Sequence, residues 1–115
     1  MDIKQDKAEA FALRIIDLYI YLKRKGETVL SKQLLRSGTS IGANIAESSY
    51  SESTGDMIHK LHISLKEASE TKYWLKLLFK SNFIEETPYR SMLAECEELI
   101  KILTSIINTL KAKSK

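Results

Sequence analysis

The sequence predicts an all-α fold, an antiparallel up-down-up-down bundle of four helices. Only four glycines and one proline occur in 115 residues, which is too few turn residues for a small all-β protein. Apolar residues recur at intervals of three and four, the period of a helix with one buried face. The connections between these segments are short, which favours antiparallel neighbours. We expect a single domain over residues 1–115, with helices at about 3–25, 32–50, 54–80 and 88–112.

The first two predicted helices each carry one clear buried face. On helix 3–25 that face consists of Ala8, Phe11, Ile15, Leu18 and Leu22. A basic run ending at Lys25 and then Gly26 indicate its end. We expect Ser31 to cap helix 32–50, whose core face holds Leu34, Ile41 and Ile45. Gly38 and Gly42 lie in this helix at a spacing that allows another backbone to approach closely.

Capping residues predict where the last two helices begin. Ser53 with Asp56 resembles a capping box, so a helix should start directly after Ser53. Thr87 followed by Pro88 predicts an N-cap and a first helical residue. The apolar residues of helix 88–112 then form a heptad seam, which comprises Met92, Cys96, Leu99, Leu103, Ile106 and Leu110.

Composition excludes several classes of protein and favours none strongly. The net charge of +3 permits binding to nucleic acid without requiring it. The single cysteine, Cys96, excludes an internal disulfide and lies in an apolar seam, where we expect structural filler rather than a nucleophile. His59 and His62 share one helix with Asp56 but lack further ligands, so we expect no metal and no cofactor. No catalytic motif, signal peptide or membrane span is evident, and we expect a non-enzymatic, cytoplasmic protein.

A polar arc on the second helix has two interpretations. It comprises Gln33, Arg36, Ser37, Ser40, Asn44, Glu47 and Ser51. The arc is either a solvated face or a partly buried network that links this helix to Ser64 and Glu67 of the third helix or to another subunit. In the network, Arg36 requires a carboxylate partner, and Glu47 and Glu67 are the two alternatives.

The third helix carries apolar residues outside its main stripe, and so does the first. Leu13 and Ile20 lie off the main face of helix 3–25, and Ile63, Trp74 and Leu78 off that of helix 54–80. A monomeric bundle needs one apolar stripe on each helix, so the additional residues favour self-association.

The remaining arc of the third helix is basic and holds His62, Lys66, Tyr73, Lys76 and Lys80. Lysines interleaved with an aromatic ring can follow a phosphate backbone and stack on a base. The alternative is an ordinary solvated basic face.

Two segments carry a resemblance to a known family. LSKQLLRSGTSIGANIAES (Leu30–Ser48) and HISLKEASETKYWLKLL (His62–Leu78) resemble the signature of the four-helix-bundle proteins encoded in intervening sequences of bacterial 23S rRNA genes. That resemblance implies a ring-shaped homopentamer. The chain is also similar to the accessory protein of diversity-generating retroelements, a basic barrel that binds nucleic acid and reverse transcriptase. The family-type positions are Gln33, Arg36, Ser40, Asn44, Ala46, Glu47 and Glu67.

Residue pattern and resemblance together favour an accessory factor that binds RNA or DNA weakly as a homo-oligomer, with the basic arc as its binding surface. The alternative is a scaffold of the same oligomeric form that binds another protein and no nucleic acid.

Overall fold

A computed structural model describes residues 2–114 as an all-α protein of four helices, with no strand among those residues. The helices are α1 (Ile3–Arg24), α2 (Leu30–Ser48), α3 (Thr54–Lys80) and α4 (Glu86–Lys113). The predicted bounds of α3 are confirmed, and the end of α1 differs from prediction by one residue. Loops 25–29, 49–53 and 81–85 connect the helices. Each loop is too short to cross the molecule, so consecutive helices must lie side by side.

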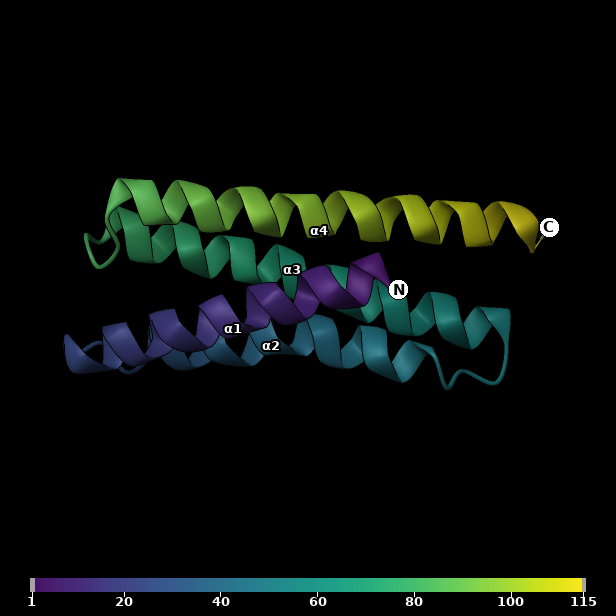
Figure 1. The fold of residues 1–115 in the computed structure, drawn as a ribbon, viewed down its shortest axis with the longest axis horizontal. Coiled ribbons are helices and arrows are strands. Elements are labelled where there is room, and N and C mark those ends of the chain that lie inside the picture. The colour runs from purple at the N-terminus through teal and green to yellow at the C-terminus, as the bar shows by residue number, and fades with distance from the viewer. Residues whose placement is uncertain (1, 115) are drawn as a thin grey trace.

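The four helices form an elongated bundle that measures 49 × 24 × 21 Å (Figure 1). Each helix packs against the next one along the chain, and α4 closes the bundle against α1. Among these four neighbouring pairs, α2 and α3 pack most extensively, and α1 and α4 least. Figure 1 shows one cause of this difference, because α1 begins well short of the end of the bundle at which α4 ends.

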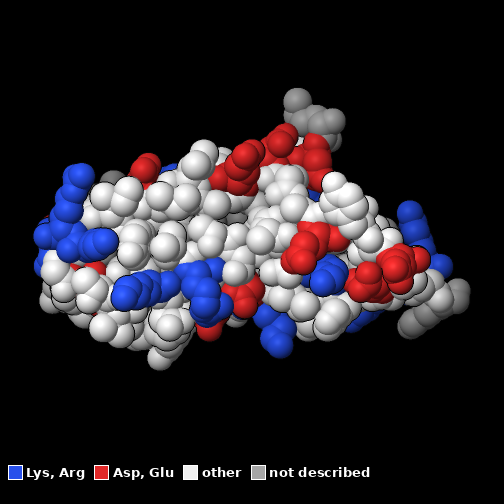
Figure 2. All heavy atoms as spheres, turned by 90° about the horizontal axis from the view of Figure 1, so that it is seen from below, with Lys and Arg blue, Asp and Glu red and all other residues white. Residues whose placement is uncertain are grey.

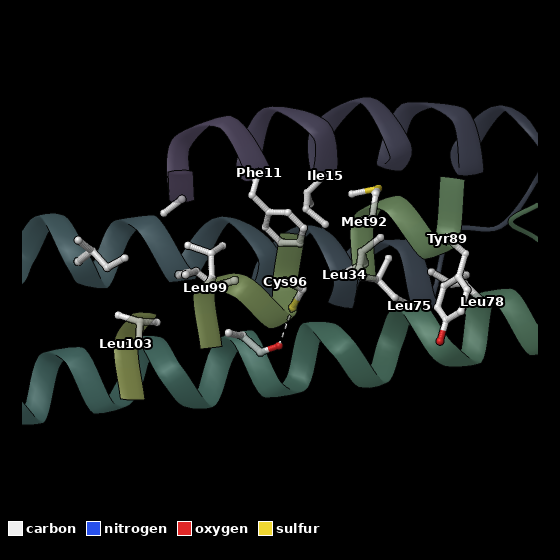
Figure 3. Close-up of a cluster of buried hydrophobic side chains, with 14 of the residues drawn as sticks. Phe11, Ile15, Leu34, Leu75, Leu78, Tyr89, Met92, Cys96, Leu99 and Leu103 are labelled. Atoms are coloured by element: carbon white, nitrogen blue, oxygen red, sulfur yellow. Dashed lines mark hydrogen bonds between the residues drawn. The ribbon is translucent and has the colours of Figure 1, made fainter. Parts of the chain in front are cut away.

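The core runs along the bundle axis and draws side chains from every helix. Figure 3 shows Phe11 and Ile15 of α1 directed toward Leu34 of α2 and the apolar residues of α4. At one end of this core the rings of Phe79 and Tyr89 stack with centroids 4.3 Å apart. The predicted core residues of α1 and α2 are buried, except Leu18, which is partly exposed.

A buried carboxylate caps α2, in place of the predicted serine. Helix α2 begins at Leu30, and Glu27 accepts hydrogen bonds from the backbone N–H groups of Val29 at 3.3 Å, Leu30 at 2.9 Å and Ser31 at 2.6 Å. The Ser31 hydroxyl instead donates to the Glu27 carbonyl. Burial by itself would raise the pKa of Glu27, but the hydrogen bonds from Leu30 and Ser31 outweigh it and lower that pKa. The prediction of Ser31 as N-cap was therefore wrong.

The predicted helix start was right for α3 and wrong for α4. Ser53 caps α3 as predicted, since its hydroxyl accepts from the Asp56 N–H at 3.0 Å. Helix α4 begins at Glu86, with Glu85 as an N-cap that makes no side-chain bond, so the prediction of Thr87 as the cap was wrong. Pro88 consequently occupies the first turn of the helix, where the missing N–H has no helical acceptor to lose.

The two glycines of α2 permit close packing against α1. A Cβ atom built on Gly38 would lie 2.8 Å from the side chain of Ile15, and one on Gly42 would lie 3.5 Å from Cβ of Ala8. The amide of Gln5 also donates to the Gly42 carbonyl at 3.1 Å. Close approach was the predicted reason for both glycines, but at Gly38 the neighbour is a branched side chain rather than a backbone.

The core seam of α4 changes its register toward the C-terminus. Met92, Cys96, Leu99 and Leu103 are buried as predicted, but the next buried residue is Ile107, while Ile106 is partly exposed. Because α1 begins late, Ile106 and Leu110 border an open hollow of about 490 Å³, lined also by Ile45, Met57 and Leu61. Toward the C-terminus of α4, beyond the start of α1, the buried residues follow the 3.6-residue period of the helix rather than the predicted heptad spacing.

The additional apolar residues of α3 pack within this chain. Leu78 is fully buried, Trp74 packs against the core, and Ile63 is partly buried. They therefore do not support self-association, contrary to their sequence interpretation. On α1 the exposure remains, because Leu13 is 59% and Ile20 42% exposed.

Candidate nucleic-acid interface

The outward side of α3 presents a row of exposed basic and aromatic side chains. His62, Lys66, Tyr73, Lys76 and Lys80 are all exposed. They recur on one face because each lies a near-integral number of helical turns from the next. From Lys66 to Lys80 this row spans about 21 Å of helix at the usual rise per residue. We call these five residues the α3 basic face.

The lysines of the α3 basic face keep their charges free. Within residues 2–114, Lys66, Lys76 and Lys80 form no ion pair. Lys72, nearer to α4 on the same helix, does pair with Glu97 at 3.2 Å. Unpaired, solvated ammonium groups are the form in which lysine binds phosphate, because no carboxylate must first be displaced.

Tyr73 provides the one aromatic ring of this face, and it is 54% exposed. Its ring contacts that of Trp74, with centroids 5.4 Å apart and planes tilted by 59°. Trp74 itself packs against the core. Because a partly buried neighbour contacts the tyrosine on one side, the rest of its exposed ring stays available to a base.

An ion-pair cluster borders the basic face on the side toward α2. The guanidinium of Arg36 donates to Glu67 at 3.0 Å and also to Glu70, and its Nε donates to Gln33 at 3.2 Å. The hydrogen bond to Glu70 raises the pKa of Arg36. Since the Arg36 side chain is 47% exposed, the cluster is a surface feature.

The structure selects between the two alternatives for the Arg36 partner. Glu67 is a partner, whereas Glu47 is exposed and forms no ion pair within residues 2–114. The second carboxylate, Glu70, was not predicted. Its position three residues after Glu67 places both carboxylates on one side of α3, and that spacing could have identified it.

The rest of the predicted polar network forms bonds within the fold. The Ser40 hydroxyl donates to the Arg36 carbonyl at 2.6 Å, and the Asn44 amide donates to the Ser40 carbonyl at 2.9 Å, both along α2 itself. Ser64 is buried and donates to the Ile41 carbonyl at 2.7 Å, which does join α3 to α2. Each of these three side chains donates a hydrogen bond to a backbone carbonyl and so contributes to the fold.

Ser37 was predicted on the polar arc of α2, but its buried hydroxyl partner on α3, Thr71, was not predicted. The Thr71 hydroxyl lies 2.8 Å from that of Ser37 and 2.8 Å from the Glu67 carbonyl, and both side chains are fully buried. Ser37 belongs to the polar side of α2, while Thr71 falls among the core residues of α3. Small hydroxyl residues on both helices allow α2 and α3 to pack closely with their polar groups satisfied.

The single cysteine and the histidines form no catalytic or metal site within the described residues. Cys96 is fully buried, its thiol lies 3.2 Å from the Ala68 carbonyl (Figure 3), and burial raises its pKa to about 12. Such a thiol stays protonated at neutral pH. Within residues 2–114, no group of three or more His, Cys, Asp or Glu side chains is arranged to hold a metal, and His59 is exposed. No helix in that range has the length and apolarity to cross a bilayer.

Fold and surface together define a small four-helix bundle, and the lysines of its α3 basic face form no ion pair within residues 2–114. Over residues 3–105 the chain matches the model of the 23S rRNA-intervening sequence protein family. The chain belongs to that family, as the resemblance of its second and third helices predicted. It is similar to the crystal structure of a protein of unknown function from the S23 ribosomal protein family of Bacteroides thetaiotaomicron, with a TM-score of 0.89 and 50% identity. That match covers 90% of this chain and 97% of the other. A comparison with curated proteins gives no match.

Proposed function

We propose that this protein is a non-enzymatic, cytoplasmic accessory factor that binds RNA or DNA through the α3 basic face. The observation that carries the proposal is a set of three lysines, without an ion pair in residues 2–114, around one exposed tyrosine ring. Contacts of this kind recognise the phosphate backbone and the face of any base, so the binding has little sequence preference.

The length of the α3 basic face fits a nucleic-acid strand. About 21 Å of helix separates Lys66 from Lys80, which corresponds to roughly six nucleotides of one strand in a duplex. With three phosphates neutralised, one chain would bind weakly at physiological salt. Several copies on one strand would raise the overall affinity without any new contact.

Self-association is therefore part of the proposal. We propose that the chain, an antiparallel up-down-up-down bundle, forms a homo-oligomeric ring, with five subunits as the family resemblance implies. The apolar side chains of Leu13 and Ile20 on α1 support contact between copies, because they stay 59% and 42% exposed in the fold that residues 2–114 form. A ring would place the α3 basic faces of its subunits on a shared surface and multiply their charge.

The test is a titration of the purified protein into fluorescently labelled RNA and DNA of mixed sequence, repeated at several salt concentrations. If three lysines per chain neutralise three phosphates, the log–log salt slope per bound chain is about −2 on single strands and about −3 on duplex. A protein that binds neither nucleic acid at low salt would contradict the proposal. The protein-interaction scaffold would then be the better interpretation of the same fold.

A further inference from the structure

Two hollows adjoin the first turn of α1 and extend along the last turns of α4. One has a volume of about 490 Å³ and the other of about 570 Å³, and both are lined by Asp2, Lys4 and Ile106. Beyond α1 itself, their larger apolar side chains comprise Ile45, Met57, Leu61, Ile102, Ile106 and Leu110. We call the surface formed by these six residues the end groove.

The end groove lies where α1 would continue if it were as long as α4. Lys7 donates to Glu98 at 2.9 Å, and Ile3 lines the same hollow as Ile102, so α1 starts level with Ile102. From there α4 runs on to Lys113, which is about 16 Å of helix. Figure 1 shows α3 and α4 both continuing past the N-terminus of α1. About three turns of α4 therefore lack the neighbour that α1 provides along the rest of the bundle.

The end groove presents a surface that suits a helix. On α4, Ile102, Ile106 and Leu110 follow one another at intervals of four residues, as Met57 and Leu61 do on α3. Rows with this spacing form the ridges against which another helix packs. A helix also satisfies its own backbone hydrogen bonds, whereas an extended segment would need partners that apolar side chains do not offer. The groove therefore fits a helix better than an extended segment.

Charges of opposite sign flank the two edges of the end groove. On the α4 edge, Lys111 and Lys113 follow Leu110 and are exposed. On the opposite edge, at the end of α2 and in the loop after it, Glu47 and Glu52 are exposed. Within residues 2–114 none of these four charged side chains forms an ion pair. Figure 2 views the molecule from the side of α1 and α2, and basic and acidic side chains form separate groups at its right-hand end, where α4 ends.

We infer that the end groove binds an amphipathic helix of another protein, about three turns long. Its apolar face covers the end groove, its acidic edge faces Lys111 and Lys113, and its basic edge faces Glu47 and Glu52. Only one direction of the helix is favourable, because the reverse direction would place like charges together on both edges. The occupant extends the bundle in line with α1 and completes its apolar core at this end.

A helix from a second copy of this chain fits the end groove less well. The shortest helix with exposed apolar residues, α1, has 22 residues and is about 33 Å long, and its own α2 and α4 flank it. The groove extends for about 16 Å, and the first turn of α1 closes one end of it. A short helix on a segment of another protein meets neither obstacle. This surface is separate from the α3 basic face, so the inference does not depend on binding to nucleic acid.

Two fluorescent model peptides of about eleven residues, cross-linked to stay helical, test the inference. Both carry leucine at positions i, i+3, i+4 and i+7. The polarised peptide has glutamate along one edge and lysine along the other, and the basic peptide has lysine along both. By fluorescence anisotropy, the protein should bind the polarised peptide at least roughly tenfold more tightly than the basic one. Lys111→Glu with Lys113→Glu should reverse this order, because both edges of the groove are then acidic. Exposed lysines contribute little to stability, so this variant should fold.

A matched pair of variants locates the binding surface. Ile106→Glu should weaken the polarised peptide by roughly tenfold or more, because it places a charge under the apolar face of the helix. Ile20→Glu is the control, since Ile20 is 42% exposed on α1 and lies outside the end groove. Thermal unfolding checks that both variants fold, and the Lys111 and Lys113 variant decides the outcome if Ile106→Glu does not.

Three results would overturn the inference. The first is equal binding of the two peptides, and the second is an equal loss in Ile106→Glu and Ile20→Glu. The third is a protein that binds neither peptide and whose assembly, measured by sedimentation velocity, dissociates in Ile106→Glu, because a second copy would then cover the groove. Titration of the same proteins into RNA tests the α3 basic face independently, so either surface can fail without the other.

Discussion

The polar residues on the two sides of α3 serve different purposes. On the inner side, Ser64 donates to the Ile41 carbonyl at 2.7 Å, and Thr71 lies 2.8 Å from Ser37, so every hydroxyl is engaged by α2. On the outer side, Lys66 and Lys76 have no partner within residues 2–114. A polar residue indicates binding only where the fold leaves it unengaged, and on this helix that side is the outer one.

The two sides of α3 should differ most in how much their side chains contribute to the stability of the fold. Leu75 is fully buried, and Leu75→Ala should lower the free energy of unfolding by about 2–5 kcal/mol through lost burial and a cavity. Lys76→Ala, one residue later on the outer side, should change it by less than about 0.5 kcal/mol. Chemical denaturation of the two variants measures both values. Comparable losses would mean that the outer side also contributes to the fold.

Tyr73 tests what the outer side does. If its ring stacks on a base, Tyr73→Ala should cost roughly 1–3 kcal/mol in binding to a single strand and little in binding to duplex, where bases are not accessible. Tyr73→Phe keeps the ring and is the matched control, which should bind as the parent does. A loss shared by both variants, or by single and double strands alike, would argue against stacking.

Arg36 lies at the border between the two sides, and its exposure sets the size of its effect. A fully buried arginine would cost several kcal/mol when removed, because its carboxylate partners would stay buried without it. Since the Arg36 side chain is 47% exposed, Arg36→Ala should destabilise by only about 1 kcal/mol. High salt should reduce the difference further, as denaturation at two ionic strengths can show. A loss above about 3 kcal/mol would place Arg36 with the inner residues.

Glu27 is an engaged polar residue at the start of α2, and its contribution to the stability of the fold should depend on pH. Its pKa is lower in the folded chain than in the unfolded one, so the carboxylate stabilises the fold at neutral pH. That contribution is present above the ordinary pKa range of glutamate and is lost as the pH falls through the lowered value. Glu27→Gln should therefore destabilise by about 1 kcal/mol at neutral pH and much less in acid. A difference that stays constant across this pH range would exclude the carboxylate as the cause.

Local signals in the sequence were enough to predict the helices and most of the core. Ser53 and Asp56 define the start of α3 from side chains within its own first turn, and the structure confirms it. Glu27 could not be predicted in the same way. It lies in the preceding loop and reaches the N–H groups of α2 only because that loop folds back.

Contacts between helices were less predictable. Helical periodicity determines on which face of a helix a residue lies, but it does not determine which residues of a neighbouring helix lie at the same level along the bundle axis. Arg36 and Glu47 share one face of α2, but about 16 Å of helix separates them, which no arginine side chain spans. Glu67 and Glu70 lie on α3 at the same level along the bundle axis as Arg36, and only the packing of α2 on α3 determines this level. The same limit applies to Leu78, which looked separate from the main stripe and is buried.

The most direct test of the α3 basic face compares two triple charge reversals with equal change in net charge. One carries Glu at Lys66, Lys76 and Lys80, and the other carries Glu at Lys101, Lys111 and Lys113, which are exposed on α4. The affinity of both for the same short single-stranded RNA is measured at low salt. We expect the α3 variant to lose roughly a hundredfold or more and its salt slope to flatten, while the α4 variant loses less than about tenfold. Equal losses in the two variants, or an α3 variant that binds like the parent, would contradict the assignment of the binding surface to α3.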